Sequence, residues 1–281
     1  MNRHLRIASA TLGLLAALAV SFDSIAAARA DCERRYKPEA GQEGKDVIWL
    51  PTSDALVTRM LRMAGVGGND LVYDLGAGDG KIAIAAAKEF GARAVGVEYN
   101  PDMAKLGQCF AEADGVANRV RIIQGDIFET DFSQASVVTL YLLPELNLRL
   151  RPTILQMKPG TRVVSHSFLM GDWEPDERSQ TEDGRAYLWF VPADINGSWN
   201  FSSKDGADRF AVRIDQRFQH LNGRVNGNQY FTEASLRGDQ LTLAFELEGT
   251  RIRISGRVAG NRIEATVTRG GNAAAYVGIR G

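Results

Sequence analysis

The chain has 281 residues, of which 44% are hydrophobic and 24% charged, and its formal net charge is −1. This length predicts one or two domains, and the composition supports a buried core while excluding a bundle of membrane helices. Without a basic stripe we expect no nucleic-acid groove, and with three scattered histidines and no cysteine cluster we expect no metal site.

Residues 1–30 have the features of a secretory signal peptide. Two arginines precede an apolar run over residues 7–20, and Ala28-Arg29-Ala30 fits a small-x-small cleavage site. Cleavage after Ala30 predicts a periplasmic or secreted protein with no stable membrane span. The alternative is a retained N-terminal membrane anchor, although the apolar run is shorter than the ~20 residues that a span requires.

The chain has two cysteines, Cys32 and Cys109. In an oxidising compartment they could form a disulfide that pins the N-terminal segment to a helix. Two unpaired thiols are the favoured alternative, because the sequence does not set the distance between the two residues.

Residues 31–48 are polar and predict an N-terminal loop, after which Pro51-Thr52-Ser53 opens a helix with apolar residues at helical spacing. Strands then alternate with helices five times, which predicts an α/β domain over residues 49–193 with a parallel sheet and helices on both faces. Asn100-Pro101 marks a helix start. The strands are expected near residues 71–74, 94–98, 120–124, 137–143 and 161–166, with a closing antiparallel strand over 186–191.

The composition changes after Pro192. Residues 196–281 hold no long helical pattern, and their apolar residues alternate with polar ones between glycine-rich turn signals. This pattern predicts a separate antiparallel β domain, either a small barrel or a sandwich. We expect Trp199, Phe201 and Phe218 in its core. The role of this domain stays open between a stabilising lid and the binding of substrate or envelope.

The most informative stretch is Asp74-Leu75-Gly76-Ala77-Gly78. An apolar strand precedes it and a good helix former follows it, and this order of strand, glycine turn and helix is typical of a nucleotide-type cofactor site. The spacing differs from the dinucleotide pattern, because Lys81 stands where that pattern has its third glycine. A second strand ends in Glu98, where a carboxylate can accept both hydroxyls of a ribose.

Together these residues resemble the S-adenosylmethionine (SAM) site of class I methyltransferases. In that family the glycine turn lies against the methionine part of SAM, the acid after the second strand binds the ribose, and an acid after the third strand lies near the adenine. The resemblance implies a Rossmann-like sheet and SAM as cofactor. The residues that it places at the cofactor are Thr52, Asp74, Leu75, Gly76, Ala77, Gly78, Glu98, Tyr99, Asp126 and Ile127.

Four further segments are similar to the seven-strand lysine methyltransferases that modify ATP synthase subunit c and the adenine nucleotide translocase, and to their bacterial relatives. They are residues 137–147, 150–152, 158–166 and 170–173, within a match over roughly 45–193. Ser167-Phe168-Leu169 departs from the family, which usually carries acids there. The resemblance places four residues at the slot of the methyl acceptor, each with an ordinary alternative in strand core or helix start: Tyr141, Pro144, Glu145 and Asn147.

The expected function is therefore a SAM-dependent methyltransferase that acts on lysine in a protein substrate. One alternative is a methyltransferase whose acceptor is a small molecule. Another is a non-catalytic SAM-binding envelope protein whose β domain does the binding. Export conflicts with the cytoplasmic origin of SAM, and the sequence does not resolve this conflict.

Overall fold

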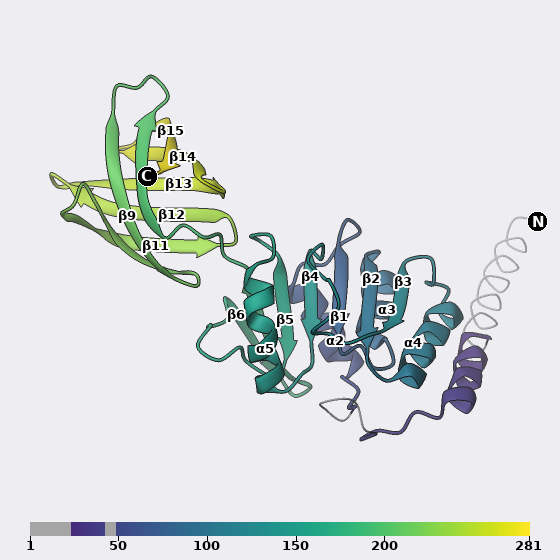
Figure 1. Ribbon diagram of the computed structural model, residues 1–281. Coiled ribbons are helices and arrows are strands. Elements are labelled where there is room, and N and C mark those ends of the chain that lie inside the picture. The colour runs from purple at the N-terminus through teal and green to yellow at the C-terminus, as the bar shows by residue number, and fades with distance from the viewer. Residues whose placement is uncertain (1–23, 43–48) are drawn as a thin grey trace, which may run out of the picture. The chain divides into compact units, whose positions relative to one another are not determined.

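The computed structural model of the protein describes residues 24–42 and 49–281 (Figure 1). The apolar run over residues 7–20 lies outside them. Contacts between residues divide the chain into two compact units. The first extends to Leu143 and adds Val164–Phe168 and Ser179–Ala186, and the second holds Pro144–Val163, Leu169–Arg178 and Tyr187–Gly281. The domain limits expected from the sequence stay predictions.

A seven-stranded sheet has the order β3-β2-β1-β4-β5-β7-β6, which confirms the expected α/β fold. Strand β1 (Leu71–Leu75) pairs in parallel with β2 (Arg93–Glu98) and β4 (Val137–Leu140), and β2 pairs in parallel with β3 (Val120–Gln124). The order of strands reverses between β1 and β4, so their carboxyl ends form the switch point at which such sheets bind ligands. The other strands are β5 (Arg162–His166), β6 (Glu177–Thr181) and β7 (Gly184–Phe190).

Two helices begin where the sequence predicts them, after Ser53 and after Asn100. The side chain of Ser53 accepts a hydrogen bond from the backbone N–H of Leu56, and Asn100 accepts two such bonds before the helix that starts at Pro101. In the first unit, α3 packs on β1 and β2, and α4 packs on β2 and β3 (Figure 1). After residue 49 the helices are α2 (Asp54–Met63), α3 (Lys81–Phe90), α4 (Pro101–Ala113) and α5 (Pro144–Leu155).

Strand β6 is not predicted from the sequence, because Glu177–Thr181 contains no apolar residue. It lies at the edge of the sheet, where a strand pairs with one neighbour through its backbone and alternate side chains face solvent. A hydrophobic pattern therefore carries no information about this strand.

The N-terminal part of the described chain is a helix over residues 24–36, so the loop expected from residue 31 onward is wrong for residues 31–36. This helix contacts α4: Arg29 Nε lies 2.7 Å from Asp114 Oδ1, and the Arg29 guanidinium lies over the Phe110 ring. The contact brings Cys32 and Cys109 together as a disulfide with 5.9 Å between their Cα atoms. The expectation of unpaired thiols is therefore wrong, since helix packing sets a distance that the sequence leaves open.

We expect Cys109→Ser to lower the free energy of unfolding by about 2–5 kcal/mol, because the disulfide joins residues 77 positions apart and restricts the unfolded chain. Urea unfolding followed by circular dichroism measures the difference. The double variant Cys32→Ser/Cys109→Ser is the control and should lose no more than the single variant. If added reductant does not change the urea midpoint of the wild-type protein, the result contradicts a disulfide between Cys32 and Cys109.

The C-terminal strands close into an eight-stranded antiparallel barrel with the order β10-β11-β12-β13-β14-β15-β8-β9. The structure thus selects the barrel from the two expected alternatives. Gly238 and Gly260 occupy two of its hairpin turns with φ of 61° and 58°, a conformation that favours glycine. The strands are β8 (Gly197–Ser203), β9 (Arg209–Arg217), β10 (His220–Val225), β11 (Gln229–Arg237), β12 (Gln240–Leu247), β13 (Thr250–Ala259), β14 (Arg262–Arg269) and β15 (Asn272–Arg280).

The barrel core contains Trp199 and Phe201, which are 0% and 1% exposed, as the sequence predicts. Phe218 is not in this core, and that expectation is wrong. Strand β9 ends at Arg217, so Phe218 lies in the turn after it with φ of 55°, and its ring stacks on Trp173 at 5.9 Å between centroids. Side chains point alternately into and out of the barrel only along a strand, so this pattern does not predict the place of a residue beyond the end of β9.

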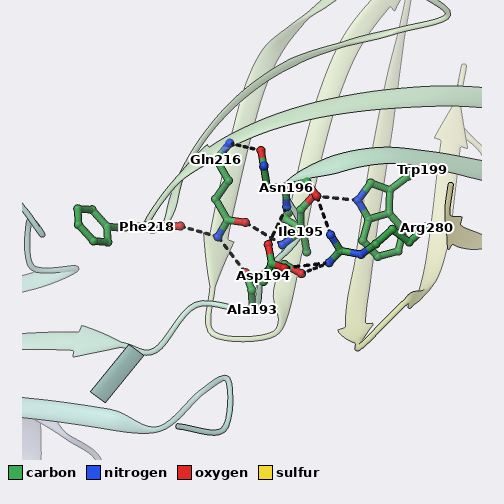
Figure 2. A network of polar contacts seen from close by, with 8 residues as sticks. All are labelled: Ala193, Asp194, Ile195, Asn196, Trp199, Gln216, Phe218 and Arg280. Atoms are coloured by element: carbon green, nitrogen blue, oxygen red, sulfur yellow. Dashed lines mark hydrogen bonds and ion pairs between the residues drawn. The ribbon is translucent and has the colours of Figure 1, made fainter. Parts of the chain in front are cut away.

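The segment Ala193–Asn196, which leads into the barrel, is held by side chains of three barrel strands (Figure 2). These side chains come from β8, β9 and β15, so the segment is part of the second unit rather than a free linker. The bonds are Gln216 Nε2 to Ala193 O (2.9 Å), Ile195 N to Gln216 Oε1 (2.7 Å), Trp199 Nε1 to Ile195 O (2.8 Å), and the Arg280 guanidinium to Asp194 O (2.5 Å) and Asn196 O (2.6 Å).

Asp172 joins α5 to the barrel within the second unit. Its carboxylate lies 2.5 Å from Arg151 Nη1 and 2.6 Å from Arg217 Nη2. The hydrogen bonds from these two arginines lower the pKa of Asp172 to about 2, so the carboxylate stays charged at neutral pH. Next to it, Trp173 Nε1 donates to Gln219 Oε1 at 3.0 Å. The turn between β9 and β10 is thereby fixed to the segment that follows β5.

Candidate active site

The glycine turn after β1 has the backbone conformation that the sequence predicts. Gly76 and Gly78 have φ of 82° and 54°, in the left-handed region. The N–H groups of Gly76 and Ala77 both donate to Val97 O, at 2.9 and 3.0 Å, which ties the turn to the end of β2. A Cβ on Gly76 would lie 2.9 Å from Leu142 Cδ2, so this position has no room for a side chain.

Glu98 connects the end of β2 to the same turn. Its Oε2 accepts the N–H of Gly78 and its Oε1 accepts the N–H of Asn100, both at 2.8 Å, and the residue is 9% exposed. Each carboxylate oxygen has two lone pairs, so both keep one for a ribose hydroxyl. Glu98 therefore shapes the turn, and its contact with the cofactor stays a prediction.

Asp74 lies inside the sheet between β2 and β4 and is 2% exposed. Thr139 Oγ1 donates to its Oδ1 at 2.6 Å. Burial, together with the negative charges of Asp79 and Glu98, raises the pKa of Asp74 to about 7, although the Thr139 hydrogen bond lowers it. Leu75, the next residue, is fully buried. These two residues support the turn from within the sheet.

The remaining cofactor candidates follow the ends of β2 and β3. Tyr99 is 50% exposed, whereas Asp126 and Ile127 are half-buried. Asp126 Oδ1 accepts the N–H of Phe128 at 2.9 Å, and Gly125 N donates to Glu98 O at 2.9 Å. The structure thus gathers the candidates at the carboxyl edge of the sheet, and their roles in holding SAM stay predictions.

Trp49 faces the glycine turn and is not predicted from the sequence, in which a single aromatic residue carries no signal. A Cβ on Gly78 would lie 2.5 Å from its indole Nε1, so the ring covers the bare Cα of that glycine. Trp49 N donates to Gln42 O at 3.0 Å, and Gly41 N donates to Trp49 O at 2.8 Å. The indole thus packs directly against the glycine turn, where the resemblance leads us to expect the methionine part of SAM.

We expect SAM to change the fluorescence of Trp49 when it binds, because the other three tryptophans, at positions 173, 189 and 199, are all 0% exposed. Trp49→Phe should remove most of the change, while calorimetry still detects binding. Titration of SAM into wild type and variant at one excitation wavelength measures this. A signal of undiminished size in the variant would place the cofactor away from Trp49.

The opposite side of the carboxyl edge carries an aromatic cluster after β4 and β5. The ring of Tyr141 stacks on His166 at 3.8 Å between centroids and on Phe168 at 6.3 Å. Thr52 Oγ1 lies 3.1 Å from His166 Nδ1, so the structure shows Thr52 beside this histidine. His166 is 8% exposed, and burial lowers its pKa below the usual value. Sequence reasoning missed His166 and Phe168, because no acid or nucleophile marks them.

The other three acceptor candidates lie in the second unit, at the start of α5. Pro144 and Glu145 are exposed in its first turn, whereas Asn147 is 0% exposed. Asn147 Nδ2 donates to Leu169 O at 3.3 Å, which joins α5 to the segment after β5. Tyr141 belongs to the first unit, and the acceptor role of all four residues stays a prediction.

Residues 24–42 and 49–281 contain neither a cluster of metal-binding side chains nor a helix that could span a membrane. No three His, Cys, Asp or Glu side chains of this part of the chain are gathered so that they could hold a metal ion. In the same part, no helix has the length and apolar character to cross a membrane.

Comparison with known proteins identifies the sheet and its glycine turn. Residues 74–177 match the ANTKMT methyltransferase domain. A protein-lysine N-methyltransferase of Saccharolobus islandicus is 46% identical over 151 residues, which are 52% of this chain and 94% of that protein. The adenine nucleotide translocase lysine N-methyltransferase of Mus musculus is 33% identical over 129 residues, which are 45% of this chain and 54% of that one.

A solved structure agrees with these matches. An RNA methyltransferase from Salinibacter ruber, in complex with S-adenosyl-L-homocysteine, is 50% identical, with a TM-score of 0.51, and the match covers 52% of this chain and 96% of that one. A relative matched over nearly its whole length at 46% identity shows common membership of a family, and the bound S-adenosyl-L-homocysteine agrees with the cofactor that the glycine turn predicts. This chain is therefore a SAM-dependent methyltransferase and belongs to the family of the ANTKMT methyltransferase domain.

Proposed function

We propose that this chain transfers a methyl group from SAM to the side-chain amine of a lysine in a protein. The observation that carries the proposal is the stack of Tyr141 on His166 at the carboxyl edge of the sheet, because an aromatic surface suits the long apolar stem of lysine. The Saccharolobus islandicus relative, which is named for lysine methylation in proteins, supports the same acceptor.

When bound, SAM would supply a methyl group on a sulfonium: a nucleophile attacks the methyl carbon in line with the sulfur, which leaves as the thioether of S-adenosylhomocysteine. The chain has to align the two reactants and exclude water. The turn at Gly76 and Gly78, with Glu98, orients the cofactor, and Trp49 covers the turn. A lysine ammonium has a pKa near 10.4 and must lose a proton first, and a buried aromatic environment favours the neutral amine. Tyr141 and His166 provide such surroundings.

RNA is a second candidate acceptor, because the Salinibacter ruber protein is described as an RNA methyltransferase. The charge of this chain disfavours it: residues 49–193 hold 14 Lys and Arg against 19 Asp and Glu. Affinity for nucleic acids depends on basic side chains that contact phosphates, and an excess of acids opposes this contact. A small molecule remains the other alternative acceptor.

The labelled methyl group identifies the acceptor. Purified enzyme and SAM with a tritiated methyl group are incubated with a cell-envelope extract, which is then separated into protein, RNA and small molecules. We expect label in protein, recovered as methylated lysine after hydrolysis, and little label with Glu98→Ala. Label confined to RNA or to small molecules would contradict the lysine assignment.

We also propose export to an oxidising compartment. The disulfide between Cys32 and Cys109 supports it, because disulfides persist mainly outside the reducing cytosol. Cleavage after Ala30 keeps this disulfide but removes Arg29 and its contact with Asp114. N-terminal sequencing of protein from the native host separates the alternatives. A start at Asp31 in the soluble envelope fraction supports cleavage, and an intact N-terminus in the membrane fraction supports an anchor.

A further inference from the structure

We propose that His166 is a positioning residue for methyl transfer, which holds the Tyr141 ring at the acceptor end of the site. This inference rests on the proposed lysine acceptor and adds a residue that acts through another one. Two parts of the histidine carry it: the ring face that stacks on Tyr141, and the Nδ1 that meets Thr52.

The stack itself is close. The centroids of Tyr141 and His166 are 3.8 Å apart with 25° between the ring planes, and Phe168 stacks on the same tyrosine at 6.3 Å. Tyr141 is the first residue after β4, where the chain leaves the sheet and backbone pairing ends. The stacked rings of His166 and Phe168 therefore define where the Tyr141 side chain lies.

His166 is itself held on several sides. Its Nδ1 lies 3.1 Å from Thr52 Oγ1. On its other side, a Cβ added to Gly184 would lie 3.3 Å from its Nε2, so the glycine backbone is close to this nitrogen. Leu56 Cδ2 lies 3.0 Å from the same Cβ position, so the imidazole and the side chain of Leu56 in α2 both face Gly184 at the start of β7. With both ring nitrogens turned to the protein and 8% exposure, His166 is placed to act through Tyr141.

The charge state of the imidazole suits this position. Burial lowers its pKa from 6.5, so the ring is neutral at neutral pH. The sulfonium of SAM and the ammonium of lysine are both positive before reaction, and a cationic residue at 166 would repel them. A neutral aromatic ring supports Tyr141 without adding a third positive charge.

Thr52 links this stack to the cofactor side of the site. It lies three residues after Trp49, which covers Gly78, and its carbonyl oxygen accepts a bond from Lys81 Nζ at 3.1 Å at the start of α3. A continuous path of contacts therefore runs from α3 through Thr52 and His166 to Tyr141. Loss of the Thr52 hydroxyl should loosen the histidine without removing its ring.

Two substitutions separate the ring from its nitrogen. His166→Phe keeps a ring that can stack on Tyr141, and His166→Asn keeps a hydrogen-bonding group near Nδ1 without a ring. The assay uses the full chain, tritiated SAM and poly-L-lysine as acceptor. We expect His166→Asn to lower kcat roughly 10- to 100-fold, the usual effect of a reactant displaced by about 1 Å, with the KM for SAM within about twofold of wild type. His166→Phe should recover most of that loss.

Three controls make the result specific. His220→Asn makes the same change at an exposed histidine of β10 and should leave kcat unchanged. In a Tyr141→Ala background, His166→Asn should cost little more, because its effect passes through the tyrosine. Thr52→Val should lower kcat less than His166→Asn does. If the asparagine variant does not fold, Thr52→Val replaces it as the test. A Thr52→Val variant with the kcat of wild type would then count against the proposal.

The outcomes are distinguishable. A His166→Asn variant with the kcat of wild type would overturn the positioning role. So would a His166→Phe variant that loses as much kcat as His166→Asn, or a His166→Asn substitution that lowers kcat as much in the Tyr141→Ala background as in wild type. A wild-type enzyme that binds SAM but methylates neither poly-L-lysine nor the lysines of envelope proteins would instead overturn the proposed function, and this inference with it. Melting temperatures of all variants identify any loss that comes from unfolding.

Discussion

Glu98→Ala should weaken SAM binding by about 1–3 kcal/mol, which corresponds to a dissociation constant roughly 5- to 150-fold higher. The carboxylate is expected to bind the ribose and already accepts the N–H groups of Gly78 and Asn100 at 2.8 Å. Its removal deletes a charge-assisted hydrogen bond to the cofactor and leaves two backbone donors without their partner. Calorimetric titration of SAM into the folded variant measures the effect.

The control for this substitution is Glu112→Ala, which removes an exposed carboxylate from α4 in the same unit. It should leave the dissociation constant unchanged. Circular dichroism establishes that the Glu98 variant is folded. A folded Glu98→Ala protein with wild-type affinity would remove the ribose assignment, and the site would then have to be sought away from the end of β2.

Asp74→Asn should stabilise the protein increasingly as the pH rises. Burial raises the pKa of this carboxyl from 3.8 to about 7 in the folded state. The unfolded chain therefore loses the proton first, so wild-type stability is fully present below pH 3.8 and falls as the pH rises through about 7. Asparagine does not titrate, and its oxygen still accepts the Thr139 hydroxyl.

We expect the stability advantage of Asp74→Asn to grow by about 2–3 kcal/mol between pH 5 and pH 8, at about 1.4 kcal/mol per unit of pKa difference. Urea unfolding at several pH values measures it. The exposed Asp183→Asn should show no such growth. An advantage that is constant with pH would mean that Asp74 is ionised in the fold at pH 5.

The periodic parts of the fold are predictable from sequence, and the parts set by tertiary packing are not. Strands β1 to β5 are rich in apolar residues between turn signals, and each begins close to the expected residue, but β4 ends at Leu140, so the strand expected up to residue 143 is wrong for residues 141–143. Strand β6 has a polar edge sequence, and Phe218 lies beyond the end of a strand, so neither follows a hydrophobic period. Barrel closure depends on the pairing of β8 with β15, between residues far apart in the chain.

Some residues of the candidate site are predictable from the sequence and others are not. Glycines at 76 and 78 and the acid at 98 are visible in the sequence because a tight turn and a carboxylate each need particular residue types. Trp49 and His166 carry no such signature, since their importance comes from the neighbours that the fold places beside them. The same holds for Cys32 and its partner, which a helix contact brings together.

A crystal structure of the protein with S-adenosyl-L-homocysteine tests the central claim most directly. We expect the methionine part to lie against Gly76 and Gly78, the ribose hydroxyls to bind Glu98, and the adenine to lie near Asp126. The sulfur should face Tyr141, on the side where the lysine is expected to enter. A cofactor bound elsewhere, or a Glu98 carboxylate that does not contact the ribose, would contradict it.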